Sequence, residues 1–273
     1  MHPLLQQLIC LSFLCLSLLL NTASSTVHNT SLPNHRLHLR QSDRPKLGNV
    51  PYGQIIRTCT TLNTIALTFD DGPSPFTPLI LDALSQYPNA KATFFVNGDN
   101  FGRGRIDDPS LPWPATVRRM HAAGHQVGNH GWSHADLTHV SSDVRYDEVL
   151  RVEEALANIL GFYPAYFRPP YGLCDTTECM ADLGEMGYHV VNFDVDTKDF
   201  EHDSGDLATG IQWSKDIFGT WAREMAIVLA HDVYNETAET LVPYMLEVVA
   251  ERGWRMVTVG ECLGDPAENW YRS

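Results

Sequence analysis

The chain of 273 residues is 44% hydrophobic and 10% aromatic, with 19 Gly and 16 Pro, a composition that excludes collagen, coiled coils and low-complexity disorder. Its 33 acidic and 19 basic residues give a net charge of −14, which makes nucleic acid and anionic lipid surfaces poor partners. The length is sufficient for one α/β barrel, a fold that commonly takes roughly 250 residues.

The N-terminal segment has the pattern of a secretion signal. Residues 1–25 contain no Asp, Glu, Lys or Arg, and the apolar run at residues 8–20 is too short to span a bilayer, which takes about 20 residues. Small residues follow at positions 23–25, as a signal-peptidase site requires. A membrane anchor or a buried helix is the alternative interpretation. We predict a signal peptide at residues 1–25, an extracellular chain, and no membrane anchor after cleavage.

A polar arm follows the predicted signal. Residues 26–50 mix Pro, Asn, Ser and His without an apolar period, which predicts a flexible or processed segment. Asn29 and Asn235 each begin a triplet that matches the signal for N-glycosylation. Such triplets also occur by chance, so glycosylation at both positions is predicted only as a consequence of secretion.

From residue 51 onward, short apolar runs alternate with segments of helical periodicity. The predicted strands are 65–69, 92–96, 125–128, 165–167, 188–195, 226–230 and 254–259. The predicted helices are 77–87, 114–123, 141–160, 175–186, 211–223 and 236–251. Short buried strands separated by helices predict a single α/β domain with a parallel sheet, open or closed, over residues 51–265. Residues 266–273 are predicted to form a C-terminal tail.

Polar residues follow five of the predicted strands, where a parallel α/β barrel places its active site. Each of them alone has a structural explanation, such as a turn or a buried hydrogen bond. Together they predict a functional site at one end of the barrel. The residues are Asp70 and Asp71, His130, Arg168, Asp194 and Asp196, and His231 and Asp232.

Two imidazoles stand four residues apart in the segment His-Gly-Trp-Ser-His. If residues 130–134 make a helical turn, His130 and His134 face the same side. Two imidazoles and a carboxylate suit a tetrahedral divalent metal that keeps its fourth position open, which is the arrangement of a catalytic site. At the end of a strand, one of Asp70 and Asp71 can bind the metal while the other takes a proton.

Four cysteines remain after the predicted signal is removed, and three pairings are open to them. Cys174 and Cys179 close a short loop and form the natural local pair. Cys59 and Cys262 then join the two ends of the domain. A cysteine metal site is the alternative, although the spacing matches no zinc ribbon.

Five ordered segments resemble the motifs of the polysaccharide deacetylases, carbohydrate esterase family 4. The similarity covers roughly residues 59–262, and the lead-in and the cysteines are most similar to those of secreted fungal chitin deacetylases. The resemblance implies a catalytic domain that is a distorted (β/α) barrel of about seven parallel strands. The motifs are Thr-Phe-Asp-Asp-Gly-Pro at 68–73, His-Gly-Trp-Ser-His at 130–134, Phe-Arg-Pro-Pro-Tyr at 167–171, Asp-Thr-Lys-Asp-Phe at 196–200 and Leu-Ala-His-Asp at 229–232.

The resemblance also implies a role for each motif. One divalent metal, zinc or cobalt, is held by Asp71, His130 and His134. Asp70 is then the general base for the attacking water, and Arg168 orients it. His231 is the general acid. Asp196 is assigned as the carboxylate that holds His231.

The substrate contacts follow from the same resemblance. The backbone N–H of Tyr171 binds the oxyanion, while Leu229 and Phe200 line the pocket for the acetyl methyl group. Two positions depart from the family pattern. Gly131 stands where Ser or Thr is usual, and Phe200 stands where Trp is usual.

The implied reaction is hydrolysis of the N-acetyl group of N-acetylglucosamine units in chitin or its oligomers, with release of acetate. Glucosamine units remain, and the enzyme is expected to act as a secreted monomer. A peptidoglycan N-deacetylase or an acetylxylan esterase would use the same motifs. A non-catalytic carbohydrate-binding protein would have lost a ligand or a proton carrier, and this chain retains all of them.

Overall fold

The computed structural model describes residues 44–202 and 207–273. The predicted signal peptide, the arm up to residue 43 and Asn29 lie outside these ranges. Within the described ranges, no helix is both long enough and apolar enough to cross a membrane.

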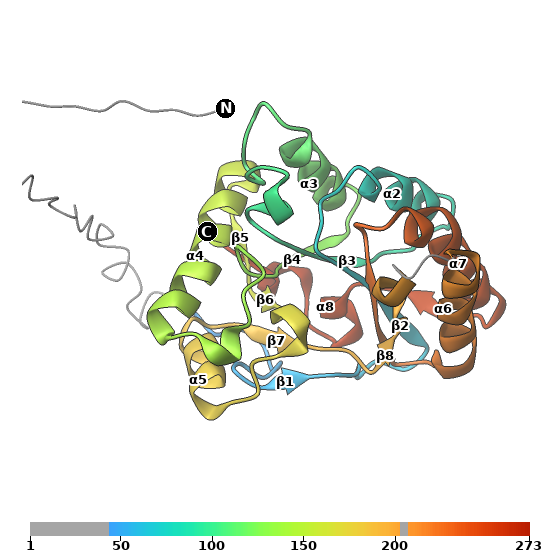
Figure 1. The fold of residues 1–273 in the computed structure, drawn as a ribbon. Coiled ribbons are helices and arrows are strands. Elements are labelled where there is room, and N and C mark those ends of the chain that lie inside the picture. Colours follow the sequence, from blue (N-terminus) through green and yellow to red (C-terminus); the bar gives the residue numbers. More distant parts are fainter. Residues whose placement is uncertain (1–43, 203–206) are drawn as a thin grey trace, which may run out of the picture. The chain divides into compact units, whose positions relative to one another are not determined.

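Nine strands of the described chain form a parallel sheet in the spatial order β1-β7-β6-β4-β3-β2-β9-β8, with β10 beside β2 (Figure 1). The sheet curves into a half-barrel whose end strands, β1 and β8, do not pair with each other. The predicted parallel α/β fold is thereby confirmed. The strands are β1 (Ile55–Ile56), β2 (Thr64–Asp70), β3 (Thr93–Val96), β4 (Gln126–Asn129), β6 (Tyr166–Phe167), β7 (His189–Val191), β8 (Val195–Asp196), β9 (Ile227–His231) and β10 (Arg255–Met256).

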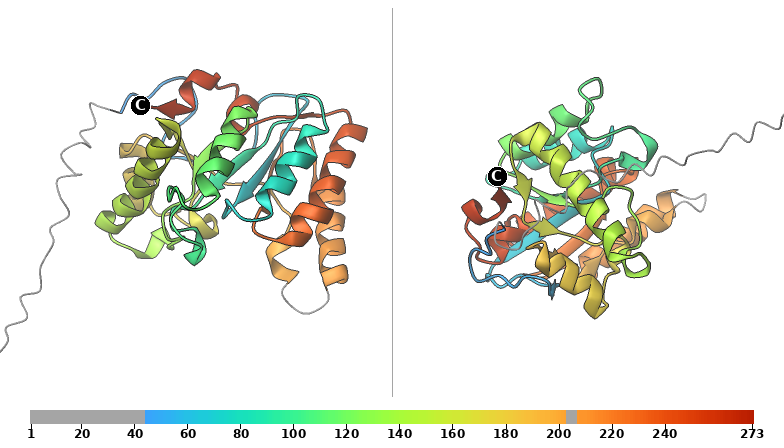
Figure 2. Two further views of the ribbon diagram at one scale, coloured as in Figure 1. Left: turned by 90° about the horizontal axis from the view of Figure 1, so that it is seen from above. Right: turned by 90° about the vertical axis from the view of Figure 1, so that its left-hand side faces the viewer.

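Helices surround the outer face of this sheet, and neighbours contact one another in the order α5, α4, α3, α2, α7 and α6 (Figure 1). Figure 2 shows the same helices from two further directions, with the strands on their inner side. The helices are α2 (Thr77–Ser85), α3 (Trp113–Ala122), α4 (Ser142–Leu160), α5 (Thr177–Glu185), α6 (Leu207–Trp221), α7 (Val242–Glu251) and the short α8 (Val259–Cys262).

Strand β2 lies at the centre of the core, and all seven of its residues are buried. Ile65, Leu67 and Phe69 belong to the apolar cluster shared with the outer helices. Ala66 belongs to a different cluster, inside the half-barrel. Because side chains alternate along a strand, Asp70 shares the inner face with Ala66, which aims its carboxylate into the barrel.

Three predicted elements differ from the structure. The expected strand 188–195 is two strands, because β7 pairs with β1 and β6 whereas β8 pairs with β9. The chain between them joins opposite ends of the sheet. The expected helix 236–251 is a π-helix, Thr237–Leu241, followed by α7. The expected strand 254–259 shortens to β10 and gives way to α8.

The C-terminal residues form part of the domain and not a separate tail. β11 (Tyr271–Arg272) pairs antiparallel with β5 (Tyr163–Pro164). The guanidinium of Arg272 is buried and donates to the carbonyl of Gly187 at 2.5 Å. Residues 266–273, predicted as a tail, therefore pack against the rest of the domain.

Covalent and ionic links fasten the N-terminal part of the domain. Cys59 pairs with Cys262, and Cys174 pairs with Cys179, which confirms both predicted disulfides. Arg44 forms a buried, two-pronged ion pair with Glu153, at 2.8 and 2.5 Å. Arg44, which lies within the predicted arm, is therefore part of the folded domain.

Candidate metal centre and active site

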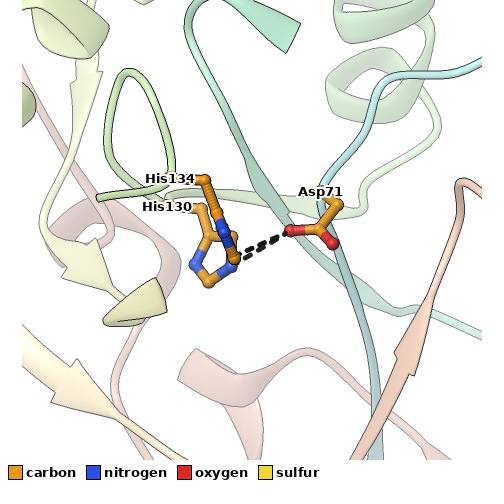
Figure 3. A group of neighbouring side chains, drawn as sticks. All are labelled: Asp71, His130 and His134. Atoms are coloured by element: carbon orange, nitrogen blue, oxygen red, sulfur yellow. Dashed lines mark ion pairs between the residues drawn. The ribbon is translucent and has the colours of Figure 1, made fainter. Parts of the chain in front are cut away.

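Three of the predicted side chains converge at the carboxyl ends of β2 and β4 (Figure 3). Asp71 directly follows β2, and His130 directly follows β4. The Oδ1 atom of Asp71 lies 3.4 Å from Nε2 of His130 and 3.3 Å from Nε2 of His134. The structure thus brings together the carboxylate and both imidazoles that the sequence predicted as ligands.

The donor set fits a tetrahedral divalent metal. Asp71 Oδ1 is buried and has no hydrogen-bond partner within the described part of the chain. Its distances to the two Nε2 atoms match the edge of a tetrahedron whose metal–ligand bonds are about 2.1 Å. Nδ1 of His130 lies 2.7 Å from the carbonyl oxygen of Arg168, so Nδ1–H donates there and Nε2 keeps its lone pair.

The segment that carries the two histidines is a loop and not the helical turn considered above. Gly131 has φ +78° and His134 has φ +58°, both in the left-handed region. Such values suit Gly131 but are uncommon for a residue with a side chain. The two imidazoles meet because this loop folds back, and not because they share a helix face.

The charges at this centre favour metal binding. Burial would raise the pKa of Asp71, but contact with His130 and the charges of the surrounding imidazoles lower it to about 2. Burial and the charge of His130 lower the pKa of His134 to about 4, so its ring is neutral. Burial alone would lower the pKa of His130, yet the charges of Asp70 and Asp71 raise it. The same negative charges favour a divalent cation at this position.

Asp70 is held by Arg168, as predicted. The buried guanidinium donates to Asp70 Oδ1 at 2.8 Å and to the Thr68 hydroxyl at 2.6 Å. It also donates to the carbonyl oxygens of Val191 and Asn192, at 3.2 and 3.1 Å. With these bonds fixing the guanidinium, the carboxylate of Asp70 has a defined orientation inside the barrel.

His231 ends β9, directly beside Asp70. The two residues are register partners of adjacent parallel strands, β2 and β9. Neighbouring strands lie about 4.8 Å apart, so the expected base and the expected acid stand side by side. This placement follows from strand pairing, which sequence motifs alone do not specify.

The carboxylate partner of His231 is Asp199, and the assignment to Asp196 is wrong. Nδ1 of His231 lies 2.7 Å from Asp199 Oδ1. Asp199 Oδ2 accepts from the His231 backbone N–H at 2.7 Å and from the Thr237 hydroxyl at 2.8 Å. Burial alone would lower the pKa of His231, but the charge of Asp199 and its hydrogen bond raise it to about 10.

Asp196 has a different partner, Lys198. Lys198 has φ +57°, and its N–H donates to Asp196 Oδ1 at 2.9 Å. Its ammonium group lies 3.1 Å from Asp196 Oδ2. Asp199 stands in the same motif as Asp196, three residues later, and that second carboxylate was the available signal for the true partner.

The predicted substrate contacts lie around these groups. Tyr171 is 66% exposed and has φ +59°. The centroid of its ring lies 4.4 Å from that of the His134 ring. The ring of Phe200 lies 5.5 Å from that of His231. Leu229 precedes His231 by two positions on β9, so both side chains face the same side of the sheet.

Three other polar residues from the sequence analysis have separate partners. Asp194 accepts from the N–H of Ile227 and from Arg223. Asp232 is fully buried and accepts from the Thr77 hydroxyl at 2.6 Å. Asn235 donates to Glu239 at 2.9 Å.

Comparison with known proteins agrees with this geometry. A sequence model described as polysaccharide deacetylase matches residues 57–191. A chitin deacetylase of Colletotrichum lindemuthianum is 42% identical over 82% of this chain and 89% of that protein. A solved structure of the chitin deacetylase from the same fungus matches with a TM-score of 0.76, over 82% of this chain and 97% of that one.

Two further proteins show the same similarity. A chitin deacetylase from Pestalotiopsis is 43% identical over 82% of this chain and 72% of that protein. The structure of the peptidoglycan deacetylase PdaC from Bacillus subtilis is 31% identical, with a TM-score of 0.62, over 74% of this chain and 90% of that one.

Proposed function

Because the chain belongs to the polysaccharide deacetylase family, we propose that it hydrolyses the N-acetyl groups of N-acetylglucosamine units in chitin or chitin oligomers. The products are acetate and glucosamine units. The observation that supports this proposal most directly is the meeting of a metal-ligand triad, a base and an acid at the carboxyl ends of β2, β4 and β9. Similarity to two fungal chitin deacetylases favours chitin over other acetylated polysaccharides.

Asp71, His130 and His134 would hold one divalent metal, zinc or cobalt. When bound, such an ion supplies Lewis-acid chemistry, acidifying water and polarising a carbonyl group. Asp70 accepts the proton of the attacking water, and the Arg168 guanidinium keeps its carboxylate aimed at that water. The backbone N–H of Tyr171 stabilises the oxyanion that forms on the acetyl carbonyl; one such donor is worth about 3 kcal/mol.

The leaving amine must be protonated before it departs. His231 supplies this proton from Nε2, because its Nδ1 is committed to Asp199. The carboxylate keeps the ring in the charged form and in a fixed orientation. Leu229 and Phe200 would enclose the acetyl methyl group beside this ring.

The test is acetate release from chitin oligomers, peptidoglycan and acetylated xylan, measured in parallel on the secreted protein. We expect the highest kcat/KM on chitin oligomers. The Asp70→Asn variant should retain its metal but lose about 10²-fold or more of the rate. Faster acetate release from peptidoglycan or xylan would show that the polysaccharide concerned, and not chitin, is the preferred substrate. A fully active Asp70→Asn variant would contradict the mechanism.

Secretion as a monomer is part of the same proposal. Disulfides persist in oxidising compartments, so the two pairs in this domain support an extracellular location. Cleavage after residue 25 and glycosylation at Asn29 and Asn235 stay predictions. Intact-mass measurement of the secreted chain, before and after removal of glycans, tests all three.

A further inference from the structure

Two sets of hydrogen bonds hold the loop between the ligands His130 and His134, one for each half of the loop. The first part of the loop is held by residues at the carboxyl ends of β3 and β4. The Asn129 side chain accepts from the Gly131 N–H at 2.9 Å, and the Asn97 amide donates to the carbonyl oxygens of His130 and Gly131, at 2.7 and 3.0 Å. The carbonyl oxygen of Trp132 accepts from the backbone N–H groups of Gly98 and Asp99, at 3.2 and 2.9 Å. These neutral contacts fix the chain as far as Trp132, and Ser133 is the next residue.

The second part is held by a charged residue of a helix. Glu148 lies on α4 and is 5% exposed. Its Oε2 accepts from the backbone N–H of Ser133 and its Oε1 accepts from the Ser133 hydroxyl, both at 2.7 Å. Hydrogen bonds to an ionised acceptor are about twice as strong as neutral ones, so this is a strong attachment for a short loop.

The residue next to this attachment is the ligand His134. Its backbone has φ +58°, an uncommon value for a residue with a side chain, and its Nε2 must remain near Asp71. Its ring packs against those of Phe101 and Tyr171, which are themselves exposed. The position of this ligand therefore depends strongly on how the backbone at Ser133 is held.

Gly131 increases the dependence of the His134 position on contacts from outside the loop. Glycine at this position offers no hydroxyl for a bond within the loop. The φ of +78° here also strains any residue with a Cβ atom. Hydrogen bonds from residues outside the loop must therefore hold its backbone in place.

We infer that Glu148 is a positioning residue that holds Ser133, and through it the ligand His134, in the geometry that binds the metal. This inference rests on the proposed metal-dependent function. Glu148 is not itself a ligand, since the donor atoms that come together in the described chain are those of Asp71, His130 and His134. It acts through two hydrogen bonds to one residue.

The test is the dissociation constant for zinc, measured on metal-stripped protein by competition with a chromophoric chelator. Loss of such supporting contacts typically weakens metal binding by about 10–100-fold, so Glu148→Ala should weaken zinc binding at least about tenfold. Ser133→Ala removes only the hydroxyl bond and should weaken it about threefold. Both variants should regain most of their activity when zinc is added in excess.

Glu154 provides the matched control, because it lies on the same helix and is exposed. Glu154→Ala should bind zinc as the wild type does. Should Glu148→Ala fail to fold, Glu148→Gln keeps an acceptor for the Ser133 N–H, and an intermediate zinc affinity is expected. Wild-type zinc affinity in any folded Glu148 variant, or in Ser133→Ala, would overturn the inference. A wild-type protein that binds no zinc would instead contradict the proposed function.

Discussion

The Nδ1 atom of His231 lies 2.7 Å from Oδ1 of Asp199, a carboxylate that is itself fully buried. Two further donors, the His231 backbone N–H and the Thr237 hydroxyl, fix the other oxygen of this carboxylate. The ion pair fixes both the charge and the direction of the ring that faces the leaving amine.

The pH dependence of kcat/KM should reflect the ion pair between His231 and Asp199. His231 must be protonated to act as an acid, so activity falls as the pH rises through its pKa, which is raised to about 10. Asp199→Asn removes the charge that raises this pKa but keeps an acceptor for Nδ1. The alkaline limb of kcat/KM should therefore move to lower pH. Asp196→Asn is the control, and a shift in that variant but not in Asp199→Asn would restore the original assignment.

The defect of a His231→Ala variant should depend on the leaving group. An amine needs a proton to depart, whereas a phenolate leaves with little help. We expect a large loss of kcat on chitin oligomers and a much smaller loss on an activated acetyl ester. Metal content should be unchanged. Equal losses on both substrates would show that His231 is not the acid.

Removal of the metal should abolish activity. Chelation followed by dialysis should leave inactive protein, and added zinc or cobalt should restore the rate, because the Lewis-acid chemistry depends on the ion. His130→Ala should lower both the bound metal, measured by atomic emission, and the rate. Full activity of metal-free protein would contradict a metal-dependent reaction.

The two disulfides should differ in their effect on stability. Cys59 and Cys262 are 203 positions apart, and the chain-entropy relation gives about 5 kcal/mol for a loop of that size. Cys174 and Cys179 are 5 positions apart, for which the same relation gives about 2 kcal/mol. Denaturant unfolding of the two double Cys→Ser variants measures the losses. A larger loss in the short-loop variant would contradict the entropic account.

Much of the fold could be predicted because buried parallel strands are continuous apolar runs. The apolar run at 65–69 predicts a strand because β2 is buried on both faces. The split between β7 and β8 could not be read in this way. Residues 188–195 contain no Gly or Pro that would mark a turn, and only the pairing of the two strands with different neighbours separates them.

The site was predictable where motif residues contact one another near the ends of strands. Asp71 meets His130 and His134, and Asp70 meets Arg168. The choice between the two carboxylates at 196 and 199 depended on the left-handed backbone at residue 198, which no composition signal marks. Glu148 was equally hidden, because a glutamate on a helix normally predicts a solvent-exposed face.

The ion pair between Arg44 and Glu153 limits how far a protease can shorten the chain from its N-terminal side. Tyr188 donates to the same carboxylate at 2.6 Å, so a cut beyond Arg44 would leave an uncompensated charge in the interior. Loss of one partner from a buried pair costs about 3–5 kcal/mol. Trimming that stops at residue 43 or earlier leaves this pair intact, and Arg44 therefore marks the shortest form that keeps it.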